Sequence, residues 1–292
     1  MSPGPSGLVV VDKPAGMTSH DVVARLRRVF GERRVGHAGT LDPDATGVLL
    51  VGLGRATRLL RFVSGLAKAY TAQVVLGTAT DTLDASGSVV ATWDMSGVTL
   101  AQAREAAAGL TGRIEQVPPM VSAVKVDGRR LHELARRGIE VERPARTVRV
   151  DRFEVGPGPE PGVLAVEVEC SAGTYVRVLA ADLGARLGGG AHLRELRRTR
   201  VGSFGVEEAV PLDAVGPAAV LPPAEALRDL DRVTVDEEVA DLISMGRPLD
   251  RVPLGAQGEG PWGLVDASGQ LLAVYEGTGS DRVRPLVVLA AR

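Results

Sequence analysis

Apolar and polar residues are arranged along the chain in patterns that predict both strands and helices. Uninterrupted apolar runs at 7–11 and 48–53 are typical of short buried strands. Alternation of apolar and polar residues at 70–76, 146–153 and 163–169 is typical of strands with one buried face. Because strands and helices are mixed without a regular strand–helix–strand rhythm, the sequence favours the α+β fold class.

Three segments carry apolar residues at helical spacing. The first begins after Thr18 or Ser19, either of which can cap a helix, and Gly31 is a suitable stop for it. The second, 99–110, opens with a Thr and a Gln at capping-box spacing, and the third is 174–188. These signals predict three amphipathic helices among the strands.

The chain divides into a large and a small part. Residues 213–228 contain three prolines and indicate a linker between domains. Beyond them, 229–292 shows short strand-like segments and turns with little helix. We therefore expect one domain over 1–228 and a small β-rich domain over 229–292.

Composition and charge bound the classes of function. The 292 residues are 45% apolar and 24% charged, with a net charge of −2, so no global basic field indicates a nucleic-acid partner. RNA would have to bind local patches, and arginines do cluster. The clusters are Arg25, Arg27, Arg28, Arg33 and Arg34; Arg129, Arg130, Arg136 and Arg137; and Arg194, Arg197, Arg198 and Arg200. Each is either a solvated face or part of a phosphate-binding groove.

Cysteine usage and the lack of apolar spans indicate a reduced, cytoplasmic location without a membrane partner. Cys170 stands alone, which excludes an internal disulfide and a thiolate metal cluster, and its place in a strand predicts a buried thiol. The N-terminus carries no signal peptide, and no stretch has the length of a membrane span. The four histidines show no metal-ligand spacing.

The segment 36–47, GHAGTLDPDATG, concentrates the candidate chemistry. It is long and rich in glycine, and it holds His37, Asp42 and Asp44 together. An acidic turn, with Asp42 capping backbone N–H groups, explains it equally well. Asp42 to Thr46 also match D-x-D-x-T, the nucleophile loop of Mg²⁺-dependent phosphotransferases, but that motif expects an apolar strand leading directly into the first Asp. No phosphate-binding P-loop or dinucleotide fingerprint is present.

Long blocks of the sequence resemble the TruB family of tRNA pseudouridine synthases. They occur in the family's order over most of residues 7–205. The blocks are VVVDKPAGMTSHDVV (9–23), RVGHAGTLDPDATGVLLVGLGRATRL (34–59), KAYTAQVVLGTATDTLDASG (68–87), VPPMVSAVKVDGRRLHELARRG (117–138), CSAGTYVRVLAADLG (170–184) and GGAHLRELRRTRVGSF (189–204).

The resemblance implies an enzyme that isomerises uridine 55 in the T-loop of tRNA to pseudouridine. It implies a catalytic domain with a mixed, mainly antiparallel sheet flanked by helices, and a C-terminal PUA-like RNA-binding domain. The expected partner is the T-arm loop of tRNA. No cofactor, metal or protein partner is implied, and a monomer is expected. A non-catalytic RNA-binding protein and a phosphotransferase stay open as alternatives.

The resemblance assigns the family's site residues to the matching positions of this sequence. The catalytic carboxylate is Asp42, the tyrosine that stacks on the target base is Tyr70, and the partner that keeps Asp42 ionised and oriented is Arg177. Further contacts to the uridine fall on His37, Tyr175 and Leu196. Asp42 acts either as the nucleophile at C1′ or as the base at C2′, and the sequence does not choose between them. Val121 departs from the family's pattern, because an aromatic residue is usual there, and this puts one packing contact in question.

Overall fold

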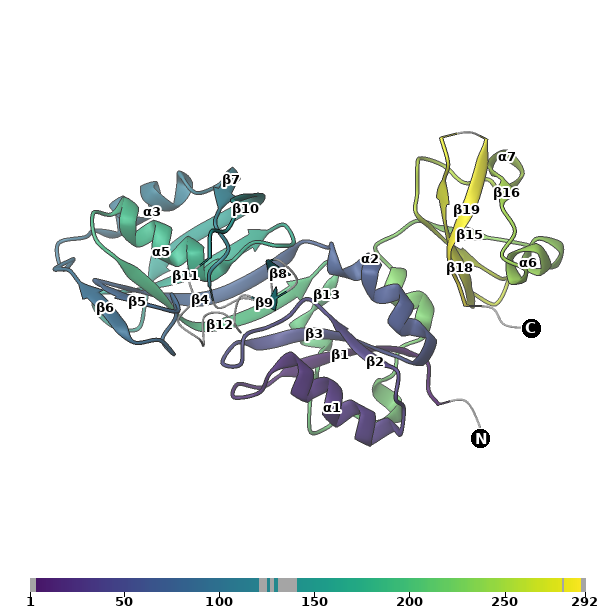
Figure 1. Cartoon of the computed structure of the whole chain (residues 1–292), viewed down its shortest axis with the longest axis horizontal. Helices are drawn as coiled ribbons and strands as arrows, with labels where there is room; N and C mark the ends of the chain where they lie inside the picture. Colours follow the sequence, from purple (N-terminus) through teal and green to yellow (C-terminus); the bar gives the residue numbers. More distant parts are fainter. Residues whose placement is uncertain (1–3, 121–124, 127–128, 131–140, 280, 290–292) are drawn as a thin grey trace. The chain divides into compact units, whose positions relative to one another are not determined.

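The computed structural model describes residues 4–120, 125–126, 129–130, 141–279 and 281–289 (Figure 1). The contacts within the chain divide it into two compact units. Unit 1 consists of Met1–Pro43, Val48–Gly65 and Gly202–Arg292, and unit 2 of Asp44–Gly47 and Leu66–Val201. Neither unit is continuous in sequence. Among the described residues, no helix is both long and apolar enough to cross a bilayer.

The N-terminal part of unit 1 is a small sheet with one covering helix. Its strands are β1 (Gly7–Lys13), β2 (Val35–Ala38), β3 (Thr46–Leu53) and β14 (Val210–Pro211). β14 is parallel to β1, and β2 and β3 form an antiparallel hairpin. The short helices η1 (Gly54–Leu59) and α2 (Leu60–Ser64) follow β3 directly. The chain therefore leaves the sheet in two consecutive short helices.

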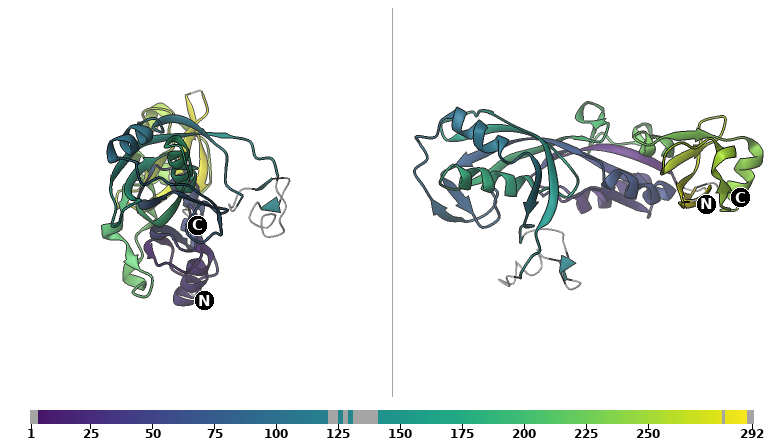
Figure 2. Two further views of the ribbon diagram at one scale, coloured as in Figure 1. Left: turned by 90° about the vertical axis from the view of Figure 1, so that its left-hand side faces the viewer. Right: turned by 90° about the horizontal axis from the view of Figure 1, so that it is seen from above.

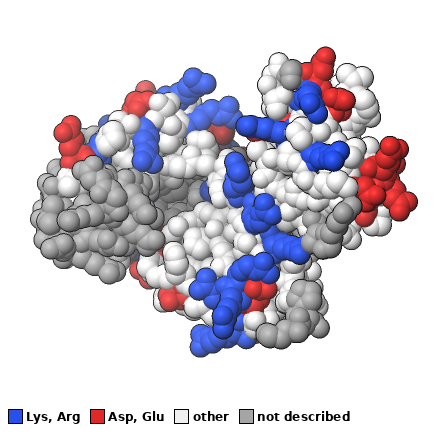
Figure 3. Space-filling model, turned by 45° about the vertical axis from the view of Figure 1, so that its right-hand side comes forward, with Lys and Arg blue, Asp and Glu red and all other residues white. Residues whose placement is uncertain are grey.

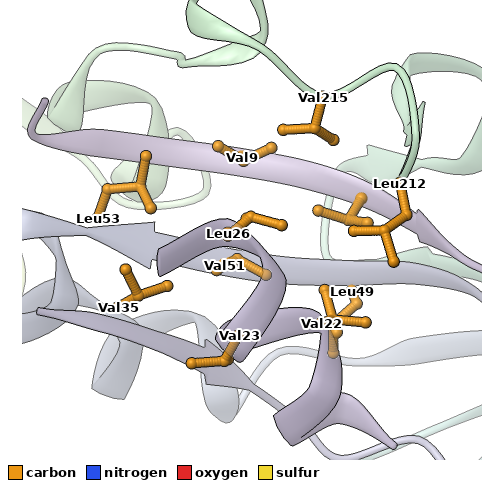
Figure 4. Packing of buried hydrophobic residues seen from close by; sticks show 11 residues of the cluster. Val9, Val22, Val23, Leu26, Val35, Leu49, Val51, Leu53, Leu212 and Val215 are labelled. Carbon is orange, nitrogen blue, oxygen red and sulfur yellow. The ribbon is translucent and has the colours of Figure 1, made fainter. Parts of the chain in front are cut away.

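Helix α1 (Ser19–Phe30) begins and ends as its sequence predicts. The Thr18 hydroxyl accepts a hydrogen bond from the Asp21 N–H at 3.1 Å, and the Asp21 carboxylate accepts one from the Thr18 N–H at 2.9 Å. Gly31 closes the helix with a φ of 61°. The buried face of α1 packs against β1 and β3, as Figure 4 shows for Leu26 between Val9 and Val51. The core of unit 1 thus holds the start of α1 firmly on the sheet.

The C-terminal part of unit 1 is a separate five-stranded sheet in the order β15-β17-β18-β19-β16. Its strands are β15 (Arg232–Thr234), β16 (Leu249–Asp250), β17 (Trp262–Val265), β18 (Leu271–Gly277) and β19 (Arg282–Val288). They surround a core that includes Trp262 and Tyr275. Two short helices, α6 (Glu237–Ser244) and α7 (Arg251–Leu254), accompany the strands. The β-rich character predicted for this region is confirmed, and the boundary at 228/229 stays a prediction.

The proline-rich stretch before this sheet is packed rather than open. It forms two 3₁₀ helices, η3 (Pro217–Ala219) and η4 (Pro223–Leu227). Leu227 is 1% exposed, and η4 contacts β1, η1 and α2. The part of 213–228 that forms η4 is therefore packed against the N-terminal part of unit 1, and the role of this stretch as a linker between domains stays a prediction.

Unit 2 is an antiparallel sheet in the order β12-β4-β11-β10-β7. Its strands are β4 (Lys68–Leu76), β7 (Gly112–Gln116), β10 (Arg146–Pro157), β11 (Val163–Cys170) and β12 (Ala191–Val201). Helix α3 (Leu100–Ala108) packs on β10, and helix α5 (Val176–Arg186) packs on β12 beside α3 (Figure 2). Unit 2 also contains the small strands β5 (Thr78–Thr80), β6 (Val89–Thr92), β8 (Lys125–Val126) and β9 (Arg129–Arg130), whereas β13 (Phe204–Gly205) belongs to unit 1. A mixed, mainly antiparallel sheet with flanking helices confirms the predicted α+β class.

Two strands lie where the sequence showed no strand pattern. His37 belongs to β2, opposite Val51 of β3, so the segment 36–47 begins as a strand and not as a loop. β12 is rich in arginine, yet it is the strand next to β4 and also pairs in parallel with Thr46 and Gly47. Both strands are fixed by their neighbours in the sheet, which local periodicity does not report.

Candidate active site

Asp42 lies between Leu41 and Pro43, and buried hydrogen bonds fix the backbone of both neighbours. The hydroxyl of Ser19, the first residue of α1, accepts a hydrogen bond from the Leu41 N–H at 2.9 Å and donates one to the Leu41 carbonyl at 3.2 Å. Ser19 is 1% exposed and Leu41 3% exposed, so these bonds are shielded from water. Asp42 itself is only partly buried. Its carboxylate is therefore carried by an ordered backbone.

Lys13 fixes the other side of Asp42. Its ammonium donates to the main-chain carbonyls of Pro14, Met17 and Pro43 at 2.8, 2.6 and 2.9 Å, and the residue is 0% exposed. A buried ammonium is costly unless hydrogen-bond acceptors surround it. Lys13 thus ties the end of β1 to the segment that follows Asp42.

His37 lies on β2 and is partly buried. Its ring meets that of His20 on α1 edge to face, with centroids 5.2 Å apart and an interplanar angle of 84°. The contact joins the hairpin to the first turn of α1. Among the described residues of unit 1, His37 and Asp42 are the two predicted site residues.

Gly47 marks the end of this segment and the start of close strand pairing. Its φ is 101°, a backbone conformation that residues other than glycine rarely adopt. A Cβ at this position would lie 2.1 Å from the Arg198 carbonyl oxygen, within unit 2. Glycine is therefore required for β3 to approach β12.

Tyr70 lies on β4 at the middle of the unit 2 sheet. It is 8% exposed and stands opposite Val168 of β11 and Arg198 of β12. Lys68 lies on the same face two residues earlier, and burial together with the nearby Arg198 lowers the pKa of Lys68 to about 8. The phenol of Tyr70 is therefore held on a rigid strand beside cationic neighbours.

Arg177 is the second residue of α5 and is 4% exposed. Its guanidinium donates to the Thr82 carbonyl at 2.9 Å and lies 3.3 Å from the Asp84 carboxylate. A buried guanidinium needs such partners, since an unpaired buried charge is strongly unfavourable. The pairing of Asp84 with Arg177 was not predicted from the sequence. The pairing of Arg177 with Asp42, which lies in the other unit, stays a prediction.

The carboxylate of Asp84 also organises the 80–87 turn. Oδ1 accepts hydrogen bonds from the Thr82 hydroxyl at 2.7 Å and from the Ser86 hydroxyl and N–H at 2.6 and 3.1 Å. Oδ2 is the oxygen that faces Arg177. Asp and Ser two residues apart are a typical turn signal, but nothing in that signal indicates an arginine 93 residues away. Asp84 is thus a partner of Arg177 that the sequence did not reveal.

Tyr175 and Leu196 occupy irregular backbone in unit 2. Tyr175 caps α5, and the buried side chain of Gln116 holds its N–H and carbonyl at 3.0 and 3.4 Å. Leu196 falls in a bulge of β12, where the register with β4 shifts between Arg194 and Arg197. Bulges redirect side chains and are common beside active sites. No sequence signal pointed to Gln116.

The contacts of the predicted arginine clusters are described for the cluster on β12. In the cluster on β12, Arg198 is 1% exposed, Arg194 binds Gln73 and Glu160, and Arg200 binds Glu169. Arg194 and Arg200 therefore contact protein groups of unit 2, and phosphate binding by this cluster stays a prediction. Arg136 and Arg137 lie outside the described residues, as does Val121, and nothing is described of the side chains of Arg129 and Arg130.

The remaining chemical candidates are Cys170, the D-x-D-x-T match and possible metal ligands. Cys170 is 1% exposed, which confirms the buried thiol, and burial raises its pKa to about 11. β2 ends at Ala38, four residues before Asp42, so no strand leads directly into the D-x-D-x-T match. Among the residues that the structure describes, no group of three His, Cys, Asp or Glu is placed to hold a metal ion.

Family models match almost the whole chain. The model of the TruB family pseudouridylate synthase N-terminal domain matches residues 27–176, the tRNA pseudouridylate synthase B C-terminal domain matches 177–240, and the tRNA pseudouridine synthase II C-terminal model matches 230–290. Together these matches cover the Asp42 segment, α5 and the C-terminal sheet.

Relatives and solved structures agree with these matches. The chain is 47% identical to tRNA pseudouridine synthase B of Mycobacteroides abscessus, covering 97% of this chain and 96% of the relative. It is 51% identical to that of Corynebacterium aurimucosum, covering 94% and 93%. A chain in the crystal structure of a Cbf5-Nop10-Gar1 complex matches with a TM-score of 0.76 at 27% identity, covering 98% of this chain and 85% of that chain.

Proposed function

We propose a site and a mechanism from one premise: the chain belongs to the TruB family of pseudouridylate synthases and is an isomerase that converts uridine in tRNA to pseudouridine. We propose that the target is uridine 55 in the T-loop. The observation that carries the proposed site is the Asp42 segment, where both neighbours of one partly exposed carboxylate are fixed by buried groups.

The reaction exchanges one glycosidic bond for another within the same nucleotide. The N1–C1′ bond breaks, the uracil turns, C5 bonds to C1′, and the proton on C5 is lost. Because no electrons or groups enter or leave apart from protons, the reaction requires no cofactor. We propose that the Asp42 carboxylate acts either on C1′ as a nucleophile or on C2′ as a base. A carboxylate on ordered backbone suits both roles, since orientation lowers the barrier of each.

Tyr70 and Arg177 complete the proposed catalytic set. We propose that Tyr70 stacks on the freed base and accepts the C5 proton; its position on a paired strand of the sheet supports this proposal. Arg177 keeps Asp42 ionised and oriented, and Asp84 in turn holds Arg177 in position. A bidentate guanidinium orients a carboxylate in a way that a lysine ammonium does not.

Binding of the substrate requires that the uridine leave its stack. Unstacking a nucleotide costs a few kcal/mol, which contacts to the extruded base must offset. We propose that His37, Tyr175 and Leu196 make these contacts, because each side chain lies on a strand or a cap whose backbone is fixed. The C-terminal sheet, which matches the family's C-terminal model, is the proposed PUA-like RNA-binding module. We further propose a cytoplasmic monomer that acts without a protein partner.

The test is release of tritium from an unmodified tRNA transcript labelled at uridine C5, with purified protein in EDTA. We expect about one tritium per transcript, mapped to position 55, and no release by Asp42→Asn at unchanged tRNA affinity. Asp44→Asn is the matched control, because Asp44 is an exposed carboxylate two residues away and would be essential in the D-x-D-x-T interpretation. Turnover by Asp42→Asn, or loss of turnover in Asp44→Asn, would overturn the assignment.

A further inference from the structure

A hollow of about 330 Å³ lies within unit 1, where the open end of the β2–β3 hairpin meets the last strand of the C-terminal sheet. Three arginines line it: Arg34 before β2, and Arg55 and Arg58 on η1. Val288 and Leu289 form its opposite wall. The hollow is therefore built from both parts of unit 1.

The positive charge of this hollow is not balanced by its lining. Arg55 and Arg58 donate to the carbonyls of Leu289 and Val288 at 2.8 and 2.7 Å, and both acceptors are neutral. No carboxylate is among the described residues that line the hollow. A guanidinium carries five N–H donors, so each arginine keeps donors for an anion. On the face of the molecule that Figure 3 draws, Lys and Arg side chains gather in a band with few acidic side chains among them.

The backbone holds the three arginines in fixed positions. Gly54 begins η1 with a φ of 57°, and its N–H donates to the Arg34 carbonyl at 2.8 Å. The Thr57 hydroxyl donates to the Gly54 carbonyl at 2.7 Å. Arg34 Nε also lies 3.7 Å from the carboxylate of Glu32, whose side chain is 9% exposed, while the side chain of Arg34 is 64% exposed. At that distance Glu32 leaves most of the five guanidinium donors of Arg34 unused. The guanidinium of Arg34 thus stays available to a ligand.

The hollow and Asp42 lie at opposite ends of the same hairpin. Val35 pairs with Leu53 at the open end, whereas Asp42 lies in the connection beyond Ala38. The four strand residues that separate them span about 13 Å. We therefore expect a phosphate in the hollow to belong to another nucleotide than the one that reacts at Asp42.

We propose that this hollow binds a backbone phosphate of the tRNA outside the target loop, through Arg34, Arg55 and Arg58. The inference rests on the proposed function and adds a second anchor to it. Arginine forks match phosphate oxygens, and a phosphodiester on a long RNA supplies the negative charge that the lining lacks. Because the wall includes β19, bound RNA would also hold the C-terminal sheet in place.

The test compares Arg34→Gln with Arg61→Gln. Arg34 lines the hollow and makes no hydrogen bond to the C-terminal strand, whereas Arg61 is an exposed arginine on α2, three residues beyond Arg58, that does not line it. Affinity for full-length tRNA is measured from 50 to 200 mM salt, alongside kcat/KM for full-length tRNA and for an isolated T-arm hairpin. Arg58→Gln provides a second variant in the hollow.

We expect Arg34→Gln to weaken full-length tRNA binding about fivefold and to make the slope of log K against log salt shallower by about 0.9, the value for one lost phosphate contact. The kcat/KM preference for full-length tRNA over the hairpin should fall by the same factor. An equal effect of Arg61→Gln, an unchanged slope, or an equal loss on the hairpin would overturn the proposal.

A further measurement distinguishes binding of inorganic phosphate from binding of tRNA. If phosphate alone stabilises the wild type against heat but not Arg34→Gln, while the tRNA salt slope is the same for both, the hollow binds small anions and the proposal is wrong. Failure of the proposed function is recognised independently, because the wild type would then release no tritium from either RNA, whatever the binding data show.

Discussion

Replacing Ser19 by alanine tests how far the Asp42 segment depends on its buried support. The substitution removes one hydroxyl and leaves both the N–H and the carbonyl of Leu41 without that partner, in a place where Ser19 is 1% and Leu41 3% exposed. A buried polar group left unsatisfied costs about 1–3 kcal/mol. With one bond at 2.9 Å and a longer one at 3.2 Å, we expect a loss of unfolding free energy of about 2–4 kcal/mol in total.

The effect on catalysis follows from the position of Leu41 next to Asp42. A shift of the carboxylate by about 1 Å lowers a rate by up to about 100-fold, so we expect kcat to fall roughly 10- to 100-fold while KM for tRNA changes little. Single-turnover tritium release measures the rate, and urea unfolding measures the stability. Ser244→Ala is the control, because its hydroxyl donates to the Asp241 carbonyl within α6, in the C-terminal part of unit 1.

The outcome that would refute this reasoning is a destabilised Ser19→Ala enzyme with a kcat within twofold of the wild type. The hydrogen bonds would then stabilise the fold without positioning Asp42. A large loss of kcat in Ser244→Ala would equally contradict it, because that serine has no connection to the segment.

Two further predictions follow from the unit 2 sheet. Asp84→Asn keeps the shape of the side chain but removes the charge 3.3 Å from Arg177, so we expect kcat to fall about tenfold or more while tRNA affinity stays within twofold. Asp81→Asn in the same turn is the control, and its rate in the same single-turnover assay should be near normal. Equal rates for the two variants would show that Asp84 does not position Arg177. Burial raises the pKa of Cys170 from 9.0 to about 11, so the thiol of the unfolded chain ionises first as the pH rises. In urea titrations, the wild type should therefore lose unfolding free energy relative to Cys170→Ala between about pH 9 and 11. A difference in unfolding free energy between the two proteins that is constant with pH would contradict this prediction.

The elements that follow from local signals were predictable from the sequence. Helix α1 is an example, because its Thr18 capping box and Gly31 stop are both formed by residues within one turn of its ends. The alternating strands β4, β10 and β11 likewise follow from the period of their apolar residues, since one face of each is buried. Their neighbours in the sheet add stability without changing the pattern.

Features that depend on distant partners were not predictable in this way. β12 carries a run of arginines that no propensity rule assigns to a strand, and it forms because β4 on one side and Gly47 on the other satisfy its backbone. The Arg177–Asp84 pair and the Gln116–Tyr175 bonds join residues far apart in sequence. The identities of Asp42, Tyr70 and Arg177 came from family resemblance, and the spacing of residues alone left Asp42 equally explained as a turn.

The hydrogen bonds on either side of Asp42 also have a consequence for entropy. Ordering one backbone residue costs roughly 1–2 kcal/mol, and for Leu41 and Pro43 this ordering is complete once the protein folds. In the proposed mechanism, little remains to be ordered when Asp42 meets the substrate beyond the torsions of its own side chain. The free energy released on binding RNA then remains available to unstack the target nucleotide rather than to order the protein.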